Sequence, residues 1–440
     1  MKPALFLATL FATALTAQVQ SGRIVGTITD PNGAVVPSAQ VSITATGTNQ
    51  SRTLQTSDVG NYVVTGLNPG LYSVRVIMQG FQTTSVSNVE IVVGQSVRVD
   101  VTLKLGETTT TVDVTTAAPL LDTESGTLGH VITNKQIVDL PLNGRSFYEL
   151  ARLLPGSALL PGGGNLLRIR ANFISGTAIS GVSGSQTTFQ LDGVNVTDHH
   201  QGGTNINTSI DALQEFKVQQ SAYSAEFSNA GGMLNATTKS GTNRFHGSLF
   251  EFLRNDKLDA RDFFARQREV LKRNQFGGTI GGPLSLPGYS GKDKQFFFFA
   301  YEGMRESQGL VFNNIVPSAA MKAGDFSRAG LPRIFDPLSL AAGARTQFSG
   351  NVIPASRISP QAIFFNKFIP DPNSGGTNFI QAPTRHLNTD QITSRFDRRI
   401  TDQHQFFARY SFHINRQNDP NSFPELGYAP LETNAPQRGG

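Results

Sequence analysis

The stretch "HQFFARYSFHINRQ", residues 404–417, alternates apolar and polar side chains along most of its length. Successive side chains of a β-strand point to opposite faces, so this alternation predicts a strand with one apolar and one polar face. The expected apolar face carries Phe406, Ala408, Tyr410, Phe412 and Ile414, and the expected polar face carries Arg409, Ser411, His413 and Asn415.

The preceding stretch, "DQITSRFDRRIT" (390–401), places Ile392, Phe396 and Ile400 on one face. We expect the two strands to pair through a tight hairpin at 401–404. In lipid every backbone N–H and C=O must be bonded, so strands cross a membrane only as a closed barrel with apolar side chains outward. A strand of a soluble sandwich also alternates, but its polar face rarely continues through so many Arg-rich neighbours. The pattern therefore favours barrel strands, with the polar face toward the lumen.

The composition fits a chain of many short strands joined by turns. Of its 440 residues 38% are apolar and 16% are charged, with 44 Gly, 22 Pro and neither Cys nor Trp. The absence of Cys removes disulfides, thiolate catalysis and Cys-based zinc sites. The net charge of +5 is spread thinly, and the dense basic stretches at 266–273 and 395–400 are short. A solvated face or the wall of an aqueous lumen is favoured over nucleic-acid binding, and no nucleic-acid partner is expected.

The N-terminus "MKPALFLATLFATALTAQ" combines Lys2, an apolar run over 4–15 and small residues that include Ala17. These features predict a secretory signal peptide over 1–17, too short to act as a membrane anchor. No later run of about 18 apolar residues follows, which excludes a transmembrane helix. We therefore expect an exported protein whose route into a membrane, if it enters one, is a β-barrel.

Residues 22–104 show short alternating strands with turn signals about every 8–12 residues, which indicates a small β-sandwich. The module resembles the carboxypeptidase-regulatory-like (transthyretin-like) family. No zinc ligands or catalytic acid of an enzyme are found in it, so it is expected to be a scaffold or binding domain. The matching positions are Gly26, Asp30, Gly33, Pro37, Ala39, Val41, Gly60, Tyr62, Leu67, Gly70, Tyr72, Gly80 and Phe81.

Residues 120–243 predict a compact α/β unit. The stretch 133–156 is typical of a helix, a loop and a second helix, and alternating strands with one short helix follow up to 243. From Phe245 the chain changes to amphipathic strands rich in Phe and Arg, separated by long loops.

This order resembles the N-terminal part of a TonB-dependent outer-membrane transporter of the Oar-like subfamily. The resemblance implies a mainly β fold: a β-sandwich (22–104), a mixed α/β plug (120–243) and the first strands of an incomplete antiparallel outer-membrane β-barrel (244–440). It also implies an outer-membrane location, a periplasmic N-terminal domain and a TonB-type inner-membrane energiser. The matching stretches are "LPLNGRSFYELARLLPG" (140–156), "FQLDGVNVTD" (189–198), the run from 215 to 255, "NQFGGTIGGPL" (274–284) and "KDKQFFFFAYEG" (292–303).

The Thr-rich stretch 105–119 joins the sandwich to the plug and has no apolar face to bury. The resemblance makes "ETTTTVDVTT" (107–116) the candidate energy-coupling segment, because an unpaired extended strand can be gripped through its main chain. A plain linker is the alternative and stays open. The residues in question are Thr110, Thr111, Val112, Asp113 and Val114.

Other candidate sites involve polar residues of the plug. Asp192, Asp198, His199 and His200 could suggest a metal site, but a turn with solvent-facing histidines is favoured. Motifs of serine enzymes, zinc proteases and phosphate-binding loops are missing, so we predict no enzyme, no catalytic residue, no metal and no cofactor. Arg168, Arg170, Asn172 and Asp192 are expected to make polar contacts between plug and lumen, either holding the plug or meeting a substrate.

Transporters of this class have about 22 strands of about ten residues around a plugged lumen. We count about six credible strands in 244–440, which is too few to enclose a plug, and so expect a fragment of a longer chain. The expected partners are the energiser, outer-membrane lipid and a bulky substrate such as a glycan, a peptide or a chelated metal. The alternative is a secreted or surface-attached adhesin or scaffold that binds carbohydrate or protein.

Overall fold

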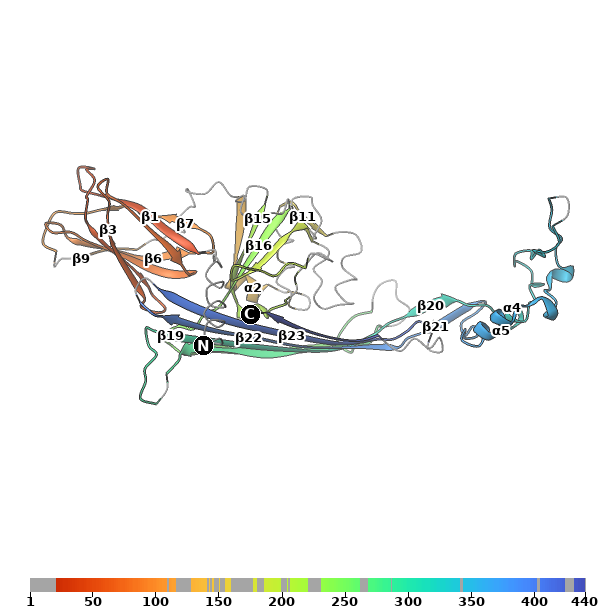
Figure 1. The fold of residues 1–440 in the computed structure, drawn as a ribbon. Coiled ribbons are helices and arrows are strands. Elements are labelled where there is room, and N and C mark those ends of the chain that lie inside the picture. Colours follow the sequence, from red (N-terminus) through yellow and green to blue (C-terminus); the bar gives the residue numbers. More distant parts are fainter. Residues whose placement is uncertain are drawn as a thin grey trace, which may run out of the picture.

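Figure 1 presents the chain as a computed structural model with three β-rich parts. A sandwich and a second, smaller sheet stand side by side above a long sheet of extended strands. The described residues are 21–108, 111–115, 128–140, 142, 145, 150, 155–159, 177–179, 186–198, 204, 206–220, 231–261, 268–285, 287–340, 343–401, 404–423 and 431–439.

The sandwich consists of two sheets that enclose one apolar core. The first sheet has the order β4-β1-β7, with β8 also pairing β1, and the second has the order β3-β2-β5-β6-β9. The strands are β1 (Gly22–Thr29), β2 (Gln40–Ala45), β3 (Ser51–Gln55), β4 (Asn61–Leu67), β5 (Gly70–Ile77), β6 (Thr83–Ile91), β7 (Ser96–Arg98), β8 (Val101–Thr102) and β9 (Thr111–Thr115).

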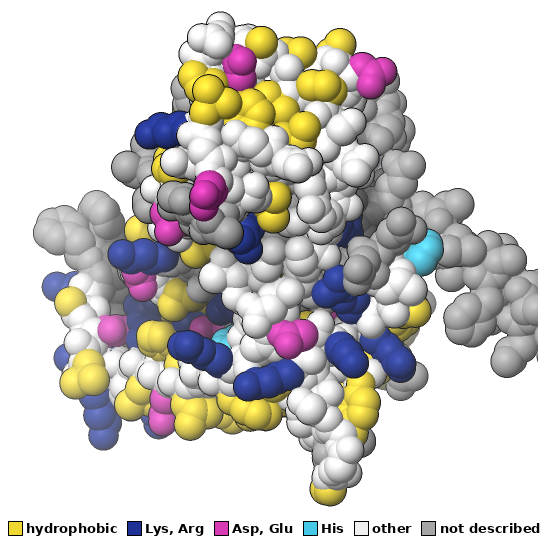
Figure 2. All heavy atoms as spheres, turned by 90° about the vertical axis from the view of Figure 1, so that its left-hand side faces the viewer, with side chains coloured by type: hydrophobic (Ala, Val, Ile, Leu, Met, Phe, Trp, Pro, Cys, Tyr) yellow, Lys and Arg dark blue, Asp and Glu magenta, His cyan; other side chains and the backbone are white. Residues whose placement is uncertain are grey.

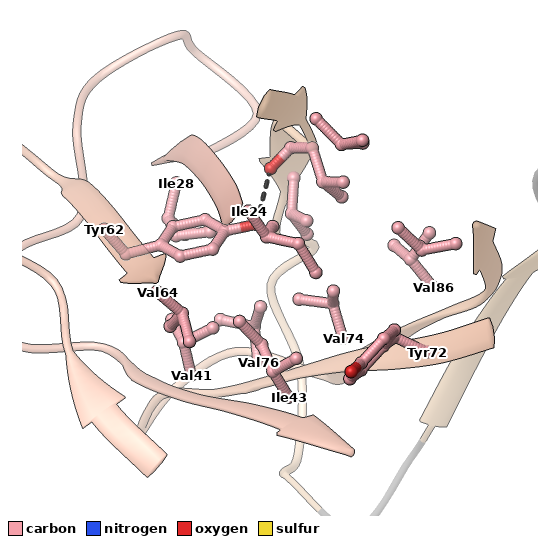
Figure 3. Packing of buried hydrophobic residues seen from close by; sticks show 14 of the residues in the cluster. Ile24, Ile28, Val41, Ile43, Tyr62, Val64, Tyr72, Val74, Val76 and Val86 are labelled. Carbon is pink, nitrogen blue, oxygen red and sulfur yellow. Dashed lines mark hydrogen bonds between the residues drawn. The ribbon is translucent and has the colours of Figure 1, made fainter. Parts of the chain in front are cut away.

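Alternation along the strands builds the sandwich core (Figure 3). In β5, Val74 and Val76 are fully buried between more exposed neighbours. The phenol of Tyr62 crosses the core and donates to the Val99 carbonyl at 2.7 Å, so its one polar group is satisfied. Gly26 must be glycine, because a Cβ there would collide with the same Val99 carbonyl.

The second sheet, which we call the plug sheet, has the strand order β10-β15-β16-β13-β14. Helix α2 (Asn134–Asp139) starts where the Gln136 side chain accepts the Thr133 N–H at 3.0 Å, and it ends before Pro141. The predicted second helix lies mostly outside the described residues. The other elements are β10 (Leu128–Thr133), β11 (Ser157–Leu159), β12 (Thr177–Ile179), β13 (Thr188–Leu191), β14 (Val194–Asn195), η5 (Ile210–Ala212), β15 (Leu213–Gln220) and β16 (Gly232–Thr238).

The long sheet, which we call the wall sheet, is antiparallel and has the order β17-β18-β19-β22-β23-β24. It is open in the part of the chain that the structure describes. Its strands are β17 (His246–Asn255), β18 (Leu271–Pro283), β19 (Gln295–Gly309), β22 (Thr384–Arg399), β23 (Gln405–Asp419) and β24 (Leu431–Gly439).

A segment inserted between β19 and β22 extends beyond the wall sheet at the end away from the sandwich (Figure 1). A two-stranded ladder leads into it, and short helices lie at its far end. Its elements are β20 (Phe312–Ile315), α4 (Ala319–Lys322), η6 (Ser349–Asn351), η7 (Ala355–Arg357), α5 (Pro360–Asn366) and β21 (Asn378–Gln381).

The alternation predicted for 404–417 is present in β23. Arg409, Ser411, His413 and Asn415 are buried against the plug side, whereas Phe406 and Tyr410 are about half exposed on the other face. The predicted pairing with 390–401 is also present, since Ile392 faces Phe412 across β22 and β23. Its turn is closed by the Thr401 N–H, which donates to the His404 carbonyl at 3.1 Å.

The outer face of the wall sheet carries many exposed apolar side chains. Figure 2 shows hydrophobic side chains along the lower margin of the sheet and Lys and Arg side chains gathered where the sheet meets the bodies above it. Among the described residues, none of the helices is long and apolar enough to cross a membrane. The exposed apolar residues of this face include Leu249, Leu253, Ile280, Phe299, Phe406 and Tyr410.

Candidate functional site: the seam between plug and wall

The plug sheet meets the inner face of the wall sheet along a seam that is mostly polar. Among the described residues, its buried apolar cluster is small and joins Ala212 of η5 to Phe298 and Ala300 of β19. On either side of this contact lies a cluster of buried charged residues. We call these the Asp192 cluster and the Arg145 cluster.

The Asp192 cluster starts from a tight turn in the plug sheet. Asp192 and Gly193 join β13 to β14 with φ of 50° and 81°, the left-handed backbone that two-residue hairpins require and that Asp-Gly favours. The turn is tied to β16, since the Thr238 N–H and hydroxyl donate to the Asp192 carboxylate at 2.8 and 2.7 Å. The Asp192 carboxylate is thus held in a fixed orientation, and its oxygens can accept further hydrogen bonds from the wall.

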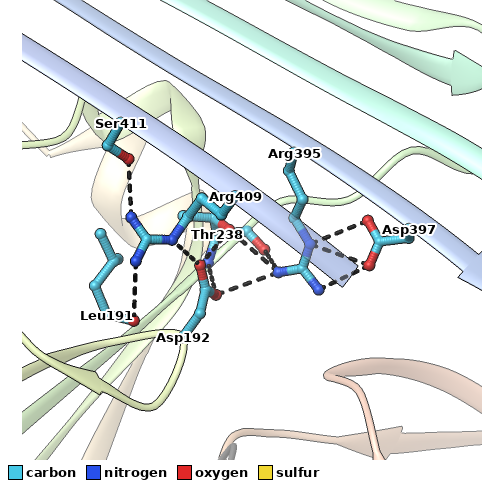
Figure 4. Close-up of polar contacts among 7 residues, drawn as sticks. All are labelled: Leu191, Asp192, Thr238, Arg395, Asp397, Arg409 and Ser411. Atoms are coloured by element: carbon cyan, nitrogen blue, oxygen red, sulfur yellow. Dashed lines mark hydrogen bonds and ion pairs between the residues drawn. The ribbon is translucent and has the colours of Figure 1, made fainter. Parts of the chain in front are cut away.

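Two arginines of the wall approach this carboxylate (Figure 4). Arg409 of β23 lies 2.9 Å from one Asp192 oxygen and Arg395 of β22 lies 3.2 Å from the other. Asp192 is only 3% exposed, and both guanidinium groups are buried as well. Because a buried charge without a partner is strongly unfavourable, the three groups stabilise one another across the seam.

A second carboxylate completes the cluster. Asp397 accepts from Arg395 at 2.9 Å, so two arginines face two aspartates and the formal charges cancel. Phe407 lies under the Arg395 guanidinium at 4.7 Å, a cation–π contact. This contact explains why an aromatic residue interrupts the polar face of β23.

In the Arg145 cluster the cation belongs to the plug and the anion to the wall, which is the opposite of the Asp192 cluster. Here the plug provides the arginine and the wall provides Glu302 of β19, with Arg145 Nε 3.6 Å from the carboxylate. Arg145 also forms an ion pair with Asp211 of the plug. Ser209 of the plug donates to Glu302 at 2.6 Å, and the Arg145 guanidinium lies 4.2 Å from the Phe250 ring of β17.

Both clusters connect plug and wall through charged, directional contacts rather than through interlocked apolar side chains. Water that enters such a seam can solvate each separated charge, whereas it cannot compensate the exposure of an apolar core. The seam can therefore be closed when water is excluded from it and can open when water enters.

The sandwich contacts the plug through the turn between β6 and β7. Glu215 of β15 accepts the Val93 N–H, and Lys217 of the same strand donates to the Gly94 carbonyl at 3.2 Å. Burial raises the pKa of Glu215 to about 7, although the Val93 N–H lowers it. The sandwich also touches the wall, where Arg399 donates to the Ser51 carbonyl at 3.0 Å.

A cavity of about 450 Å³ lies where sandwich, plug and wall meet. Its lining includes Arg52 and Tyr72 from the sandwich, Lys239 from the plug and Arg395 and Phe407 from the wall. Burial lowers the pKa of Lys239, and Asp211 partly offsets that effect. The Asp192 cluster therefore borders this cavity through Arg395.

The candidate energy-coupling segment has a defined place in the structure. Residues 111–115 form β9, which pairs in parallel with β6 of the sandwich, from Thr83 opposite Thr111 to Ser87 opposite Thr115. Val112 is half buried, and Asp113 and Val114 are exposed. Thr110 lies outside the described residues.

The remaining predicted site residues divide into two groups. Asp192 lies at the seam, whereas Arg168, Arg170 and Asn172 lie outside the described residues, as do His199 and His200. The described part of the chain contains no group of three or more His, Asp or Glu side chains that could hold a metal ion.

Sequence reasoning missed the roles of Arg145, Ser209, Asp211 and Glu302, and it did not name the partners of Asp192. One signal was present for Glu302, which shares the inward register of β19 with Phe296 and Phe298 and so interrupts a buried apolar face. No local signal pairs Arg395 with Asp192, because 203 residues separate them in the chain.

Two family models match the chain. Residues 23–104 match the carboxypeptidase regulatory-like domain, and residues 237–439 match the outer membrane beta barrel domain. Over 307 residues the chain is 30% identical to the TonB-dependent transporter Oar of Myxococcus xanthus. The chain therefore contains a region similar to each of these two domains and is similar to a TonB-dependent transporter. The match spans 65% of this chain and 27% of Oar, so the chain covers little more than a quarter of that relative.

Parts of solved outer-membrane receptors and transporters are also similar to this chain. The siderophore receptor PirA from Acinetobacter baumannii is 18% identical over 67% of this chain and 32% of its own, with a TM-score of 0.35. The outer membrane transporter YddB from Escherichia coli is 12% identical over 67% of this chain and 34% of its own, with a TM-score of 0.40. Oar and YddB are named as transporters, and PirA is named as a receptor.

Proposed function

We propose that this chain is the sandwich, the plug and part of the wall of an outer-membrane transporter, which takes up a bulky substrate with energy from a TonB-type inner-membrane energiser. In this proposal the signal peptide directs export, the sandwich lies in the periplasm and the chain is not an enzyme. The substrate class is a glycan, a peptide or a chelated metal.

The observation that carries the proposal is the seam. A carboxylate of the plug lies between two arginines of the wall, while Phe406 and Tyr410 are exposed on the opposite face of β23. A sheet with an apolar outer face and a charged inner face suits lipid on one side and a movable polar plug on the other. The similarity to Oar and the extended segment 111–115 support the same function.

A first test concerns location. In the native outer membrane the protein should resist extraction by salt and should migrate differently on a gel before and after heating, as closed barrels do. A protein that salt washes from the membrane would contradict the proposal and favour a surface adhesin.

A second test concerns energised uptake. A strain that lacks the gene is offered a glycan, a peptide or a chelated metal as its sole source of carbon, nitrogen or iron. We expect a growth defect on one class only, with the same defect in a strain that lacks the energiser. Growth of the strain that lacks the gene equal to growth of the parent strain on every source would contradict the proposal.

The segment is tested by complementing the strain with two matched variants. Proline has no backbone N–H and breaks strand pairing, whereas alanine keeps the backbone intact. The pair Val112→Pro and Val114→Pro should reduce uptake by about tenfold or more, and the pair Val112→Ala and Val114→Ala should change it by less than about threefold. Equal uptake by the two variants would remove the segment from the mechanism.

A further inference from the structure

The segment 111–115 lies as the edge strand of a folded domain. It is hydrogen-bonded in parallel to β6 over five residue pairs, from Thr83 opposite Thr111 to Ser87 opposite Thr115. The chain that leads to it follows the same strand, since the Gln82 N–H donates to the Lys104 carbonyl at 2.8 Å and the Thr83 hydroxyl donates to the Thr108 carbonyl at 2.7 Å. The sandwich therefore holds the segment along its whole described length.

The opposite edge of β9 pairs with no other strand of the described chain. It lacks the devices that usually protect a sheet edge, since it contains no proline and only one charged residue, Asp113. The edges formed by β3 and β4 differ, because Arg52 of β3 donates to the Thr65 and Gly66 carbonyls of β4 and Arg399 donates to the Ser51 carbonyl of β3. Among the described residues, the edge of β9 therefore lacks the side-chain contacts that cover the edges of β3 and β4, and that edge is the candidate energy-coupling segment.

The strand that holds β9 also leads to the plug. β6 ends at Ile91 and runs directly into the turn whose Val93 N–H and Gly94 carbonyl bond to Glu215 and Lys217 of β15. β15 lies inside the plug sheet, between β10 and β16. A pull on β9 therefore reaches the plug through β6 and this turn, in addition to the covalent path along the chain.

We infer that the sandwich is the platform for energy coupling: the energiser adds an extended strand to the free edge of β9 while β9 stays paired with β6, and the sandwich passes the pull to β15. The inference rests on the proposed function and gives the sandwich a role in it. The occupant is an extended segment of the energiser, which gains main-chain hydrogen bonds along β9 and can place a basic residue beside Asp113.

The test locks β9 onto β6. The native chain has no cysteine, so Ser85→Cys with Asp113→Cys introduces one defined pair at positions that face each other in the register. Ser85→Cys with Val112→Cys is the matched control, because Val112 lies one residue out of register and points to the other face. The protein is used whole in its outer membrane, oxidised and reduced, with the purified periplasmic domain of the energiser as the probe.

We expect the in-register pair to crosslink much more fully than the control, and the oxidised protein to bind the probe within about threefold of the reduced protein. Equal crosslinking by both pairs would overturn the inference. Binding that falls by about tenfold or more on oxidation and returns on reduction would also overturn it, since the segment would then have to leave the sandwich. If neither form binds the probe although the crosslink forms, the proposed energiser itself is wrong.

The relay is tested by Lys217→Met, which keeps the length of the side chain but removes the bond to the Gly94 carbonyl. We expect the probe to bind as to the native protein, while uptake of the substrate found in the growth test falls by about fivefold or more. The level of heat-modifiable protein in the membrane serves as the folding control. Native uptake by this variant would overturn the relay.

Discussion

The sandwich and the seam are both buried, but they are built from opposite kinds of side chain. The hydrophobic core of the sandwich contains 19 buried apolar or Tyr residues. At the seam, the buried apolar cluster of the described residues is limited to Ala212, Phe298 and Ala300, whereas ion pairs between buried side chains join plug and wall. Separating the sandwich sheets would expose apolar surface without any compensation, whereas separating the seam lets water solvate each charge.

The apolar core therefore suits the sandwich to stay intact, and the charged contacts suit the seam to open. A domain that carries a pull must remain folded while load passes through it, and an apolar core between two hydrogen-bonded sheets suits that need. A plug must leave its wall without unfolding either partner. Four predictions test this comparison, from the largest expected effect to the smallest.

The largest effect is expected from Asp192→Ala. It leaves the Arg395 and Arg409 guanidinium groups buried without their shared partner, which should destabilise plug–wall contact by about 3–5 kcal/mol. The measurement is protease cleavage of the plug in membranes over a urea series. A quadruple variant with Asp192→Leu, Asp397→Leu, Arg395→Met and Arg409→Met should recover most of the loss, because no charge of the cluster is then left unpaired. Equal loss in both variants would contradict the assignment of the effect to unpaired charge.

The second prediction concerns the other side of the comparison. Ile43 is 1% exposed in the sandwich core, so Ile43→Ala should lower the free energy of unfolding of the sandwich by about 2–5 kcal/mol. Calorimetry of the whole protein should show the sandwich transition moving while the plug transition stays in place. Val63→Ala, at a side chain 56% exposed, is the matched control and should change little. A shared shift of both transitions would mean that the two parts unfold as one unit.

A pH effect is expected where the two parts meet. Burial raises the pKa of Glu215 to about 7, while Lys217 lowers it and Glu90 raises it. Glu215 binds its proton more tightly in the assembled protein than when it is exposed. The contribution of protonated Glu215 to sandwich–plug stability is therefore full below pH 4.5 and is lost as the pH rises through about 7. Sandwich–plug contact should weaken by about 1–3 kcal/mol between pH 5 and pH 8. Protease cleavage between the two parts measures it, and Glu215→Gln should make the profile flat.

The smallest effect is expected from Tyr62→Phe. It removes the hydroxyl that donates to the Val99 carbonyl inside the sandwich and leaves that carbonyl without this donor. The expected loss is about 1 kcal/mol in the free energy of unfolding of the sandwich, read from the midpoint of urea denaturation. A change as large as that of Ile43→Ala would show that the phenol does more than satisfy its own hydroxyl.

Much of the fold could be predicted from periodicity. The alternation at 404–417 identified β23 and its buried face, and the turn residues of 22–104 identified the sandwich, because both depend on local geometry. The inward Phe407 could not be explained locally, since its reason is the Arg395 guanidinium of the neighbouring strand.

The seam was predictable only in outline. The Asp-Gly pair at 192–193 is a local turn signal, so a fixed carboxylate could be expected there. Its arginine partners come from strands more than two hundred residues away and are selected by the docking of plug on wall, which no local pattern encodes. Arg145 and Glu302 pair for the same reason.

The lengths of the wall strands carry one more consequence. β19 and β22 have 15 and 16 residues, and a tilted strand needs only about ten to cross the hydrocarbon of a membrane. In a membrane, the surplus would raise the ends at Gly309 and Thr384 by about 15–20 Å along the strand direction. The paired ends of β19 and β22 would then act as a rigid support for the inserted segment with α4 and α5. That segment would meet molecules outside the cell well above the lipid surface.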